Sequence, residues 1–234
     1  MQPLAALAAE PRAAALFFDV DGTLAPIVPV PEDARVPDAT RSELRRLASH
    51  YGLVACVSGR TSEVARAIVG VPELTYVGEH GLELDPDAES WRERIRAFAT
   101  RAPWPVEEKP LSAAFHYRTS PDRDAARRTL GAVEADARAE GFRTRWGRLV
   151  LEVLPPIDAT KRTAVSHLLA QTGLRRALYA GDDTTDLDAF AALGELELGI
   201  RVAIVSPESP PALREQADVV VDSPDALREL LAEL

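Results

Sequence analysis

The amino-acid sequence predicts an α/β protein with a doubly wound, Rossmann-like parallel sheet and a smaller inserted α+β domain. Three observations predict this fold class. Short apolar runs alternate with helical segments, the runs end at glycines and acidic residues, and the order of predicted strands and helices changes over residues 85–156. Strands that alternate with helices are typical of a parallel sheet covered on both faces. We therefore expect a core built from residues 1–84 and 157–234, with residues 85–156 as the insert.

The first buried strand is expected at residues 16–18, where an apolar run stops at Asp19-Val20-Asp21-Gly22-Thr23. In an open α/β sheet, ligands bind beyond the carboxyl ends of the strands. Asp19 and Asp21 are two residues apart, so in an extended segment their side chains leave on the same face. Two such carboxylates repel each other unless a cation lies between them or one of them holds a proton. Taken alone, the motif fits an Asx-turn that serves only turn geometry equally well.

Other predicted strands end in polar clusters of the same kind. A strand over residues 53–57 runs into Ser58-Gly59-Arg60, directly before a helix. After the insert, a strand over residues 177–180 ends at Gly181-Asp182-Asp183-Thr184-Thr185-Asp186, and Lys161 lies near the start of a helix. If these strands are neighbours, the clusters meet at one edge of the sheet.

The chemistry of these clusters suits a metal ion and a phosphate. Mg²⁺ prefers a few carboxylates together with water and phosphate oxygens. Ser58, at a helix start with exposed N–H groups, suits an anion, and Lys161 offers a compact positive charge that a phosphate accepts. Each cluster alone also has a simpler explanation. Ser58 can be a helix cap, Lys161 a solvated helix residue, and the aspartates Asp182, Asp183 and Asp186 capping residues of a loop.

The insert has a different pattern of elements. We expect a helix at residues 91–101, a half-buried strand at 111–118, an amphipathic helix at 121–140, and hairpin strands at 142–146 and 149–153 about Gly147-Arg148. Strands paired by a hairpin, with helices beside them, indicate a small α+β domain.

Composition limits the classes of partner. Lys and Arg number 27 against 37 Asp and Glu, which gives a net charge of −10. An acidic chain argues against nucleic acids and anionic membranes as partners.

The single cysteine, Cys56, lies in an apolar run, so we expect a core thiol, no internal disulfide and a reducing cytoplasm. No stretch is long enough to span a bilayer, and residues 1–15 read as a leading helix or arm rather than a signal peptide. We expect a soluble, cytoplasmic monomer.

The order of the motifs resembles the haloacid dehalogenase-like (HAD) phosphatase superfamily, and an insert between the second and third motifs is similar to its larger cap class. The four matched motifs are Asp19-Val20-Asp21-Gly22-Thr23-Leu24, Ser58, Lys161 and Gly181-Asp182-Asp183-Thr184-Thr185-Asp186. Within the superfamily the chain is similar to trehalose-6-phosphate phosphatases at Ser58-Gly59-Arg60, His80-Gly81-Leu82-Glu83, His116-Tyr117-Arg118 and residues 181–190. It departs from that family at Leu187, where Glu is usual, and at Arg162, where Gly is common.

The resemblance implies a role for each matched residue. Asp19 would be the nucleophile that forms an aspartyl phosphate, and Asp21 the general acid and base. The implied Mg²⁺ site consists of Asp19, the Asp21 carbonyl, Asp182 and Asp183, with Asp186 ordering metal-bound water. The implied substrate-binding residues of the core are Gly22, Thr23, Ser58, Gly59, Arg60 and Lys161, and those of the insert, against the sugar, are Lys109, His116 and Glu152.

The resemblance therefore implies Mg²⁺-dependent hydrolysis of trehalose 6-phosphate, with the insert as a lid that selects the sugar. The first alternative is a phosphatase of the same superfamily for glucosyl- or mannosyl-phosphoglycerate or for sucrose phosphate. A phosphomutase and a non-catalytic sugar-phosphate binding subunit are two others, and the last would be expected to lack Asp19 or Asp21. For Glu152, the alternative is a structural ion pair with Arg143 or Arg145 across the hairpin.

Overall fold

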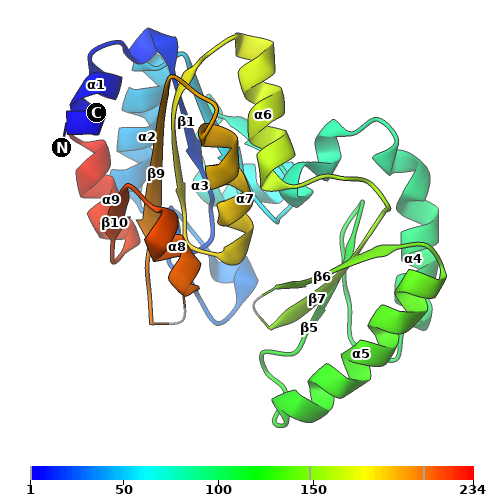
Figure 1. Ribbon diagram of the computed structural model, residues 1–234. Coiled ribbons are helices and arrows are strands. Elements are labelled where there is room, and N and C mark those ends of the chain that lie inside the picture. Colours follow the sequence, from blue (N-terminus) through cyan, green and yellow to red (C-terminus); the bar gives the residue numbers. More distant parts are fainter. Residues whose placement is uncertain (1, 148, 208) are drawn as a thin grey trace. The chain divides into compact units, whose positions relative to one another are not determined.

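The computed structural model describes residues 2–147, 149–207 and 209–234, which form two compact units (Figure 1). The core unit consists of the residues up to Gly81 and those from Ala159 to Leu234, and the insert unit consists of Leu82–Asp158. Among the described residues, no helix is long and apolar enough to cross a membrane.

The core unit contains a six-stranded parallel sheet, and this confirms the predicted fold class. Its strands are β1 (Ala14–Phe18), β2 (Leu53–Val57), β3 (Thr75–Val77), β8 (Arg176–Gly181), β9 (Leu198–Ile204) and β10 (Val219–Val221). They lie in the order β10-β9-β8-β1-β2-β3. The chain therefore winds outward from β1 in one direction before the insert and from β8 in the other direction after it. Ligands of such sheets bind where the strand order reverses, which here is between β1 and β8.

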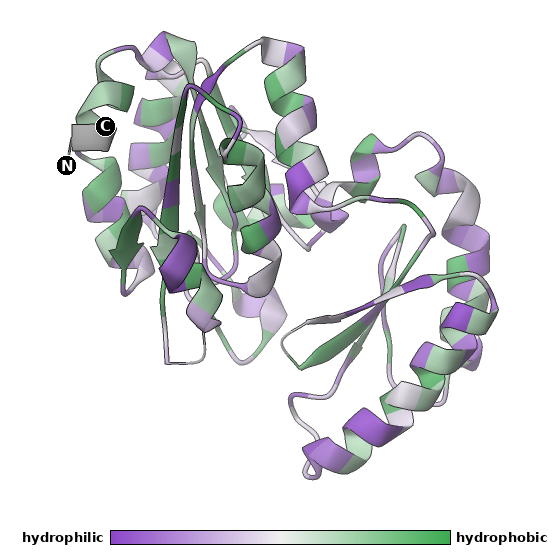
Figure 2. Ribbon diagram, viewed as in Figure 1, coloured by the Kyte–Doolittle hydropathy of each residue, from purple (hydrophilic) through white to green (hydrophobic). Residues whose placement is uncertain are grey.

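Helices cover both faces of this sheet (Figure 1). They are α1 (Gln2–Ala8), α2 (Asp38–His50), α3 (Ser62–Val69), α6 (Lys161–Thr172), α7 (Thr184–Leu193), α8 (Pro211–Gln216) and α9 (Pro224–Leu231). Leu16 and Phe18 of β1 pack in a cluster with residues of α1, α2, α3 and α9. Phe17 and Tyr179 belong to the alternate set of strand positions, which is also fully buried, and α7 packs beside β8 there. Burial on both sides explains why β1 and β2 are apolar throughout. Figure 2 shows by colour that hydrophobic residues predominate in the sheet, while β9 also carries a hydrophilic position.

Several element boundaries differ from the sequence pattern. The strand β1 begins at Ala14, two residues before the expected start, because small alanines lack the clear β preference of the phenylalanines that follow. The helix α7 begins directly within the acidic cluster after β8, at Thr184, because the Asp183 carboxylate accepts a hydrogen bond from the Thr184 N–H and caps the helix. The pattern also gave no sign of α8, which has six residues after two prolines. Cys56 is buried, as expected of a core thiol.

The insert unit contains a four-stranded antiparallel sheet in the order β4-β5-β7-β6. Its elements are α4 (Arg92–Arg101), β4 (Glu107–Glu108), β5 (Ala113–His116), α5 (Arg123–Ala139), β6 (Arg143–Gly147) and β7 (Val150–Leu154). The turn of the predicted hairpin includes Arg148, which lies outside the described residues. The strand β4 was not predicted, because two exposed glutamates carry no strand signal of their own.

The two faces of the insert sheet differ in chemistry. Phe115 and Leu151 pack with the apolar side of α4 and α5. The register places Ala114 opposite Glu152, and Glu152 opposite Arg145. Because successive side chains of a strand alternate between faces, these positions belong to the opposite, polar face.

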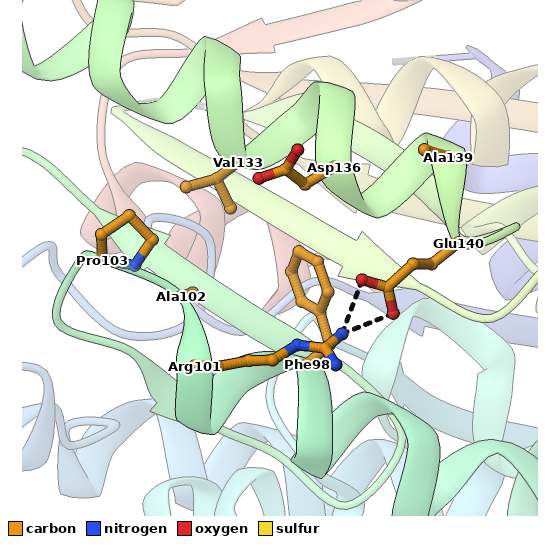
Figure 3. Close-up of a pocket in the computed structure, with 8 residues that line it drawn as sticks. All are labelled: Phe98, Arg101, Ala102, Pro103, Val133, Asp136, Ala139 and Glu140. Carbon is orange, nitrogen blue, oxygen red and sulfur yellow. Dashed lines mark hydrogen bonds and ion pairs between the residues drawn. The ribbon is translucent and has the colours of Figure 1, made fainter.

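A pocket of about 290 Å³ lies in the insert unit at the surface of α4 and α5 (Figure 3). Arg101 and Glu140 face each other there, and Arg101 Nη2 donates to both oxygens of the Glu140 carboxylate at 2.6 and 2.5 Å. The remaining lining residues are Phe98, Ala102, Pro103, Val133, Asp136 and Ala139. Besides the Arg101–Glu140 ion pair, the lining offers a single charged group, the Asp136 carboxylate, so it does not contain the several carboxylates and the second basic group that a metal and phosphate site would need.

The central place of β1 predicts a large cost for truncating it. Leu16→Ala should lower the free energy of unfolding by about 2–5 kcal/mol, because it opens a cavity in a fully buried strand. Ile27→Ala is the matched control: Ile27 is 54% exposed, and its truncation should change stability by no more than about 0.5 kcal/mol. Urea unfolding followed by circular dichroism measures both. Equal losses in the two variants would contradict the central position of β1.

Candidate active site

The candidate site begins with two aspartates that the fold brings together from distant parts of the chain. Asp19 follows β1, and Asp182 follows β8. The two strands pair in register, with Phe18 beside Ala180, and the Asp19 N–H donates to the Ala180 carbonyl at 2.9 Å. Both aspartates are buried, at 6% and 8% exposure. The predicted clusters after these two strands therefore meet at the edge where the strand order reverses.

The turn after β1 depends on a glycine that contacts the other cluster. Gly22 has a φ of +85°, and a Cβ atom added there would lie 2.2 Å from Oδ2 of Asp182. Both facts exclude a larger residue. The Gly22 N–H donates to the Ala25 carbonyl at 2.7 Å, and Thr23 Oγ1 lies 3.5 Å from Oδ1 of Asp182. Gly22 and Thr23 thus bring the β1 turn directly against Asp182.

Lys161 links Asp19 to a third carboxylate. Its Nζ atom donates to Oδ1 of Asp19 and to Oδ1 of Asp186, each at 2.6 Å, and all three side chains are buried. Lys161 is the first residue of α6, where Thr160 and Thr163 form a capping box that fixes the start of the helix. Lys161 is therefore a buried, paired ammonium. The simpler explanation, in which Lys161 is a solvated helix residue, is wrong.

Asp186 is held more completely than its place in the sequence motif indicated. Its Oδ1 atom also accepts from the Tyr179 hydroxyl at 2.7 Å, and its Oδ2 atom accepts from the N–H groups of Asp182 and Asp183, each at 2.9 Å. Asp186 therefore orders both Lys161 and the loop after β8. Tyr179 was not predicted from the sequence. The sequence does contain a signal for it, because Tyr179 is the one phenol in a strand of small and aliphatic residues. A buried tyrosine hydroxyl usually has a hydrogen-bond partner, so a partner for Tyr179 could have been sought.

The electrostatics of this cluster are unbalanced. Three buried carboxylates face one ammonium, and burial together with the neighbouring carboxylates raises the pKa of Asp19 to about 7. The same causes raise the pKa of Asp182 well above its ordinary value. Burial lowers the pKa of Lys161, but the carboxylates of Asp186 and Asp19 raise it by more, so Lys161 stays charged. Without another cation, the cluster must take up protons to stay buried.

The donor set fits a divalent cation. One carboxylate oxygen from each of Asp19, Asp182 and Asp186 lies within 4.8 Å of the other two. Asp186 already accepts four hydrogen bonds, so Asp19 and Asp182 are the two with oxygens left for an ion. Hard oxygen ligands and an excess of negative charge are the conditions under which Mg²⁺ binds. Asp183 is placed differently, because its carboxylate caps α7. Of the two adjacent aspartates, Asp182 is therefore the one whose side chain faces Asp19.

The second acidic residue of the first motif has an arginine partner. Arg60 donates to both oxygens of Asp21, from Nε at 2.6 Å and from Nη2 at 2.7 Å. Arg60 follows β2 together with Ser58 and Gly59, and its own N–H donates to Oγ of the buried Ser58 at 3.1 Å. The loop after β2 is thus connected to the turn after β1.

The three predicted sugar-binding residues lie in the insert unit. Glu152 is 7% exposed, and its carboxylate lies 3.6 Å from Nζ of Lys109 and 2.7 Å from Nη2 of Arg145. The arginine pairing that was the alternative explanation for Glu152 is therefore present, together with a contact to Lys109. His116 is exposed and lies 2.7 Å from Glu107 through Nε2.

Comparison with known families matches residues 17–104 and 96–225 to the trehalose-phosphatases. The chain belongs to the trehalose-phosphatase family. A trehalose-phosphate phosphatase of Mycobacterium avium is 35% identical over 204 residues, which cover 78% of this chain and 52% of that protein. A probable trehalose-phosphate phosphatase of Sinorhizobium fredii is 31% identical over 237 residues, which cover 94% and 87% of the two chains.

The chain thus spans about half the length of the mycobacterial trehalose-phosphatases that it matches. Among solved structures, the C-terminal domain of a trehalose-6-phosphate phosphatase of C. albicans matches with a TM-score of 0.78 and 22% identity, covering 99% of this chain and 94% of that one. A haloacid dehalogenase-like hydrolase of Bacteroides thetaiotaomicron matches with a TM-score of 0.61 and 15% identity, covering 94% and 98%. At these identities the likeness shows the fold, which is that of the HAD-like hydrolases.

The charge imbalance predicts that Asp182→Asn stabilises the metal-free protein at pH 8. The pKa of Asp19 rises from 3.8 to about 7 on folding, so the folded state holds protons that the unfolded chain releases, and stability falls as the pH rises through that window. Removing one carboxylate should raise the Tm in EDTA by roughly 2–4 °C, the shift that corresponds to about 1 kcal/mol in a chain of this size.

The gain should shrink at pH 5, below the raised pKa of Asp19, because Asp19 is then protonated in the folded parent and its repulsion with Asp182 is already relieved. Differential scanning calorimetry of both proteins at the two pH values is the measurement. A variant that is less stable than the parent at pH 8 would contradict this electrostatic account.

Proposed function

We propose that the protein is a Mg²⁺-dependent phosphatase that hydrolyses trehalose 6-phosphate to trehalose and phosphate through an aspartyl phosphate at Asp19. The observation that carries the proposal is the buried contact of Lys161 with Asp19 and Asp186, beside Asp182, at the strand ends where ligands of such sheets bind. Membership of the trehalose-phosphatase family supports both the reaction class and the substrate.

The phosphoryl group would bind between the ends of β1, β2 and α6. The Ser58 hydroxyl and the Lys161 ammonium would donate to phosphoryl oxygens, where negative charge develops as the phosphorus is attacked. Gly22, Thr23 and Gly59 would line the phosphate as parts of the loops after β1 and β2. An Asp19 carboxylate oxygen would form the new bond to phosphorus as the bond to the sugar oxygen breaks.

Asp21 would supply the proton that the leaving sugar oxygen needs. It would then take a proton from the water that attacks the phosphorus, and this step releases phosphate and regenerates Asp19. Arg60 holds both oxygens of Asp21 in the structure. Asp21 would have to release Arg60 before it acts as the acid, because a carboxyl group that accepts from a guanidinium with both oxygens cannot also hold the proton that it donates. Arg60 would then add a positive charge near the phosphoryl group.

The carboxylates of Asp19 and Asp182 and the main-chain carbonyl of Asp21 would hold the Mg²⁺ ion, while Asp183 and Asp186 would orient its water ligands. When bound, the ion would offset the repulsion between the nucleophile and the substrate dianion. Its charge would also compensate the excess of carboxylates around Lys161.

The insert unit would act as the cap domain of the HAD-like catalytic core and would select the sugar. Lys109, His116 and Glu152 carry charged or strongly hydrogen-bonding groups, which are suited to sugar hydroxyls. Lys109 and Glu152 are already near each other, at 3.6 Å. A monomeric state and a cytoplasmic location complete the proposal and remain predictions.

Another sugar phosphate is the remaining alternative substrate. Glucosyl- or mannosyl-phosphoglycerate and sucrose phosphate would need the same phosphate site with different sugar contacts. The match of the family over residues 17–225 favours trehalose 6-phosphate over these.

A phosphate-release assay over a panel of sugar phosphates tests the function. We expect trehalose 6-phosphate to give the highest kcat/KM, EDTA to stop turnover, and Mg²⁺ to restore it. Asp19→Asn is the matched control, because it removes the nucleophile with almost no change in volume, and it should abolish turnover while leaving the circular dichroism spectrum unchanged. Turnover by Asp19→Asn within about tenfold of the parent would exclude covalent catalysis, whose loss costs far more.

The sugar-binding role of Glu152 predicts a substrate-dependent effect. Glu152→Gln should raise KM for trehalose 6-phosphate and leave p-nitrophenyl phosphate turnover unchanged, because only the sugar contact is lost. Arg145 can still donate to the glutamine side-chain oxygen, so the hairpin should remain folded. Equal effects on the two substrates, or no effect on either, would mean that Glu152 serves only its ion pair with Arg145.

A further inference from the structure

The segment that follows β3 has an unusual backbone. Glu79 and His80 are consecutive residues with φ of +46° and +57°, and Gly81 follows with a φ of +106°. Left-handed conformations of residues other than glycine are strained and persist only where the surroundings fix them. We call Glu79, His80 and Gly81 the 79–81 turn. None of these three residues takes part in the proposed reaction.

The 79–81 turn is bonded to the loop that carries Ser58 and Arg60. The His80 N–H donates to the Ser58 carbonyl, and the Glu79 N–H donates to the Arg60 carbonyl, each at 2.8 Å. Two successive N–H groups can reach these two carbonyls because the left-handed backbone turns them to the same side. The loop after β2 is therefore held at both of its ends by the turn after β3.

The side chain of His80 lies against the residue between those two carbonyls. A Cβ atom added to Gly59 would lie 2.5 Å from Nε2 and 2.8 Å from Cε1 of His80, and its three nearest atoms all belong to the imidazole. The ring thus fills the space that a side chain at position 59 would take. Gly59 is required by this contact rather than by its own φ, which lies outside the left-handed region.

The other end of the 79–81 turn contacts the start of α6. A Cβ atom added to Gly81 would lie 3.1 Å from the Thr160 carbonyl oxygen and 3.2 Å from Cβ of Ala164. Thr160 is the N-cap of α6, and Lys161 is the first residue of that helix. The turn therefore lies between two elements that reach the same site, the Ser58-Gly59-Arg60 loop and the helix that presents Lys161.

We propose that the 79–81 turn, with His80 as its central residue, is a positioning element that sets the distance between the Ser58-Gly59-Arg60 loop and the N-terminus of α6. The inference rests on the proposed function, in which Ser58 and Lys161 hold the same phosphoryl group. Arg60 reaches Asp21 from the same loop. A shift of the loop would therefore change the phosphate contact and the alignment of Asp21 together.

A double-mutant cycle between positions 59 and 80 tests the proposal. Gly59→Ala should lower kcat/KM by about 10²-fold, the order of loss expected for a displacement of about 1 Å in a catalytic site. His80→Gly should cost less, about tenfold, because the loop gains freedom without being pushed. The double variant should match His80→Gly alone, since the new methyl group then meets no imidazole.

The affinity for inorganic phosphate, measured as competitive inhibition, separates positioning from stability. His80→Gly should weaken phosphate binding, and it should melt higher than His80→Ala, because glycine adopts the left-handed backbone freely. His80→Ala removes the same ring but keeps the backbone strain, so it should lose the same phosphate affinity and also melt lower. A multiplicative loss in the double variant, or unchanged phosphate inhibition in His80→Gly, would overturn the proposal.

Gly81→Ala and Gly173→Ala form a second, independent pair. Both glycines have left-handed φ, +106° and +71°, but a Cβ atom at Gly173 would have no neighbour within 4 Å. Gly173→Ala should lower only the Tm, whereas Gly81→Ala should also raise KM for the phosphate ester. Equal KM values would overturn the proposal. An unmutated protein that released no phosphate from any ester would instead refute the proposed function, so the two failures are distinguishable.

Discussion

The interaction on which the site depends is the buried contact of Lys161 with the carboxylates of Asp19 and Asp186. A carboxylate buried as deeply as Asp19 loses its hydration, and a second and a third carboxylate nearby increase the cost further. One ammonium at 2.6 Å from both Asp19 and Asp186 reduces that cost without removing it. The remaining negative charge would favour a divalent cation at this site, and a bound cation would in turn stabilise the fold that the charge imbalance weakens.

The surrounding fold can be understood as the means of holding this cluster. The reversal of strand order places β1 beside β8, and this puts Asp19 next to Asp182. The capped start of α6 presents Lys161. Gly22 then allows the β1 turn to approach Asp182 more closely than any side chain would permit. Each of these features lies at an element end, where backbone groups and the first side chain after a strand are fixed by the regular structure behind them.

Much of the fold was predictable because its signals are local. Apolar runs bounded by Gly and Asp gave the strands, and the order of the polar clusters gave the site of Asp19, Asp182 and Lys161. The hydrogen-bond pairings within the site were harder to predict, because Lys161 and Asp19 are 142 residues apart in the chain. Tyr179 escaped notice because a tyrosine in a strand is ordinary, and only the structure shows its hydroxyl on Asp186. Short elements such as β4 and α8 have too few residues to form a periodic pattern.

Covalent attachment of phosphate to Asp19 is the central chemical claim, and reductive trapping measures it directly. The protein would be mixed with trehalose 6-phosphate and Mg²⁺ and quenched with borohydride, which reduces an aspartyl phosphate to homoserine. Peptide mass spectrometry would then locate the product. We expect homoserine at position 19 only, and only when both substrate and Mg²⁺ are present. Homoserine at another aspartate, or rapid phosphate release with Asp19 never modified, would contradict it.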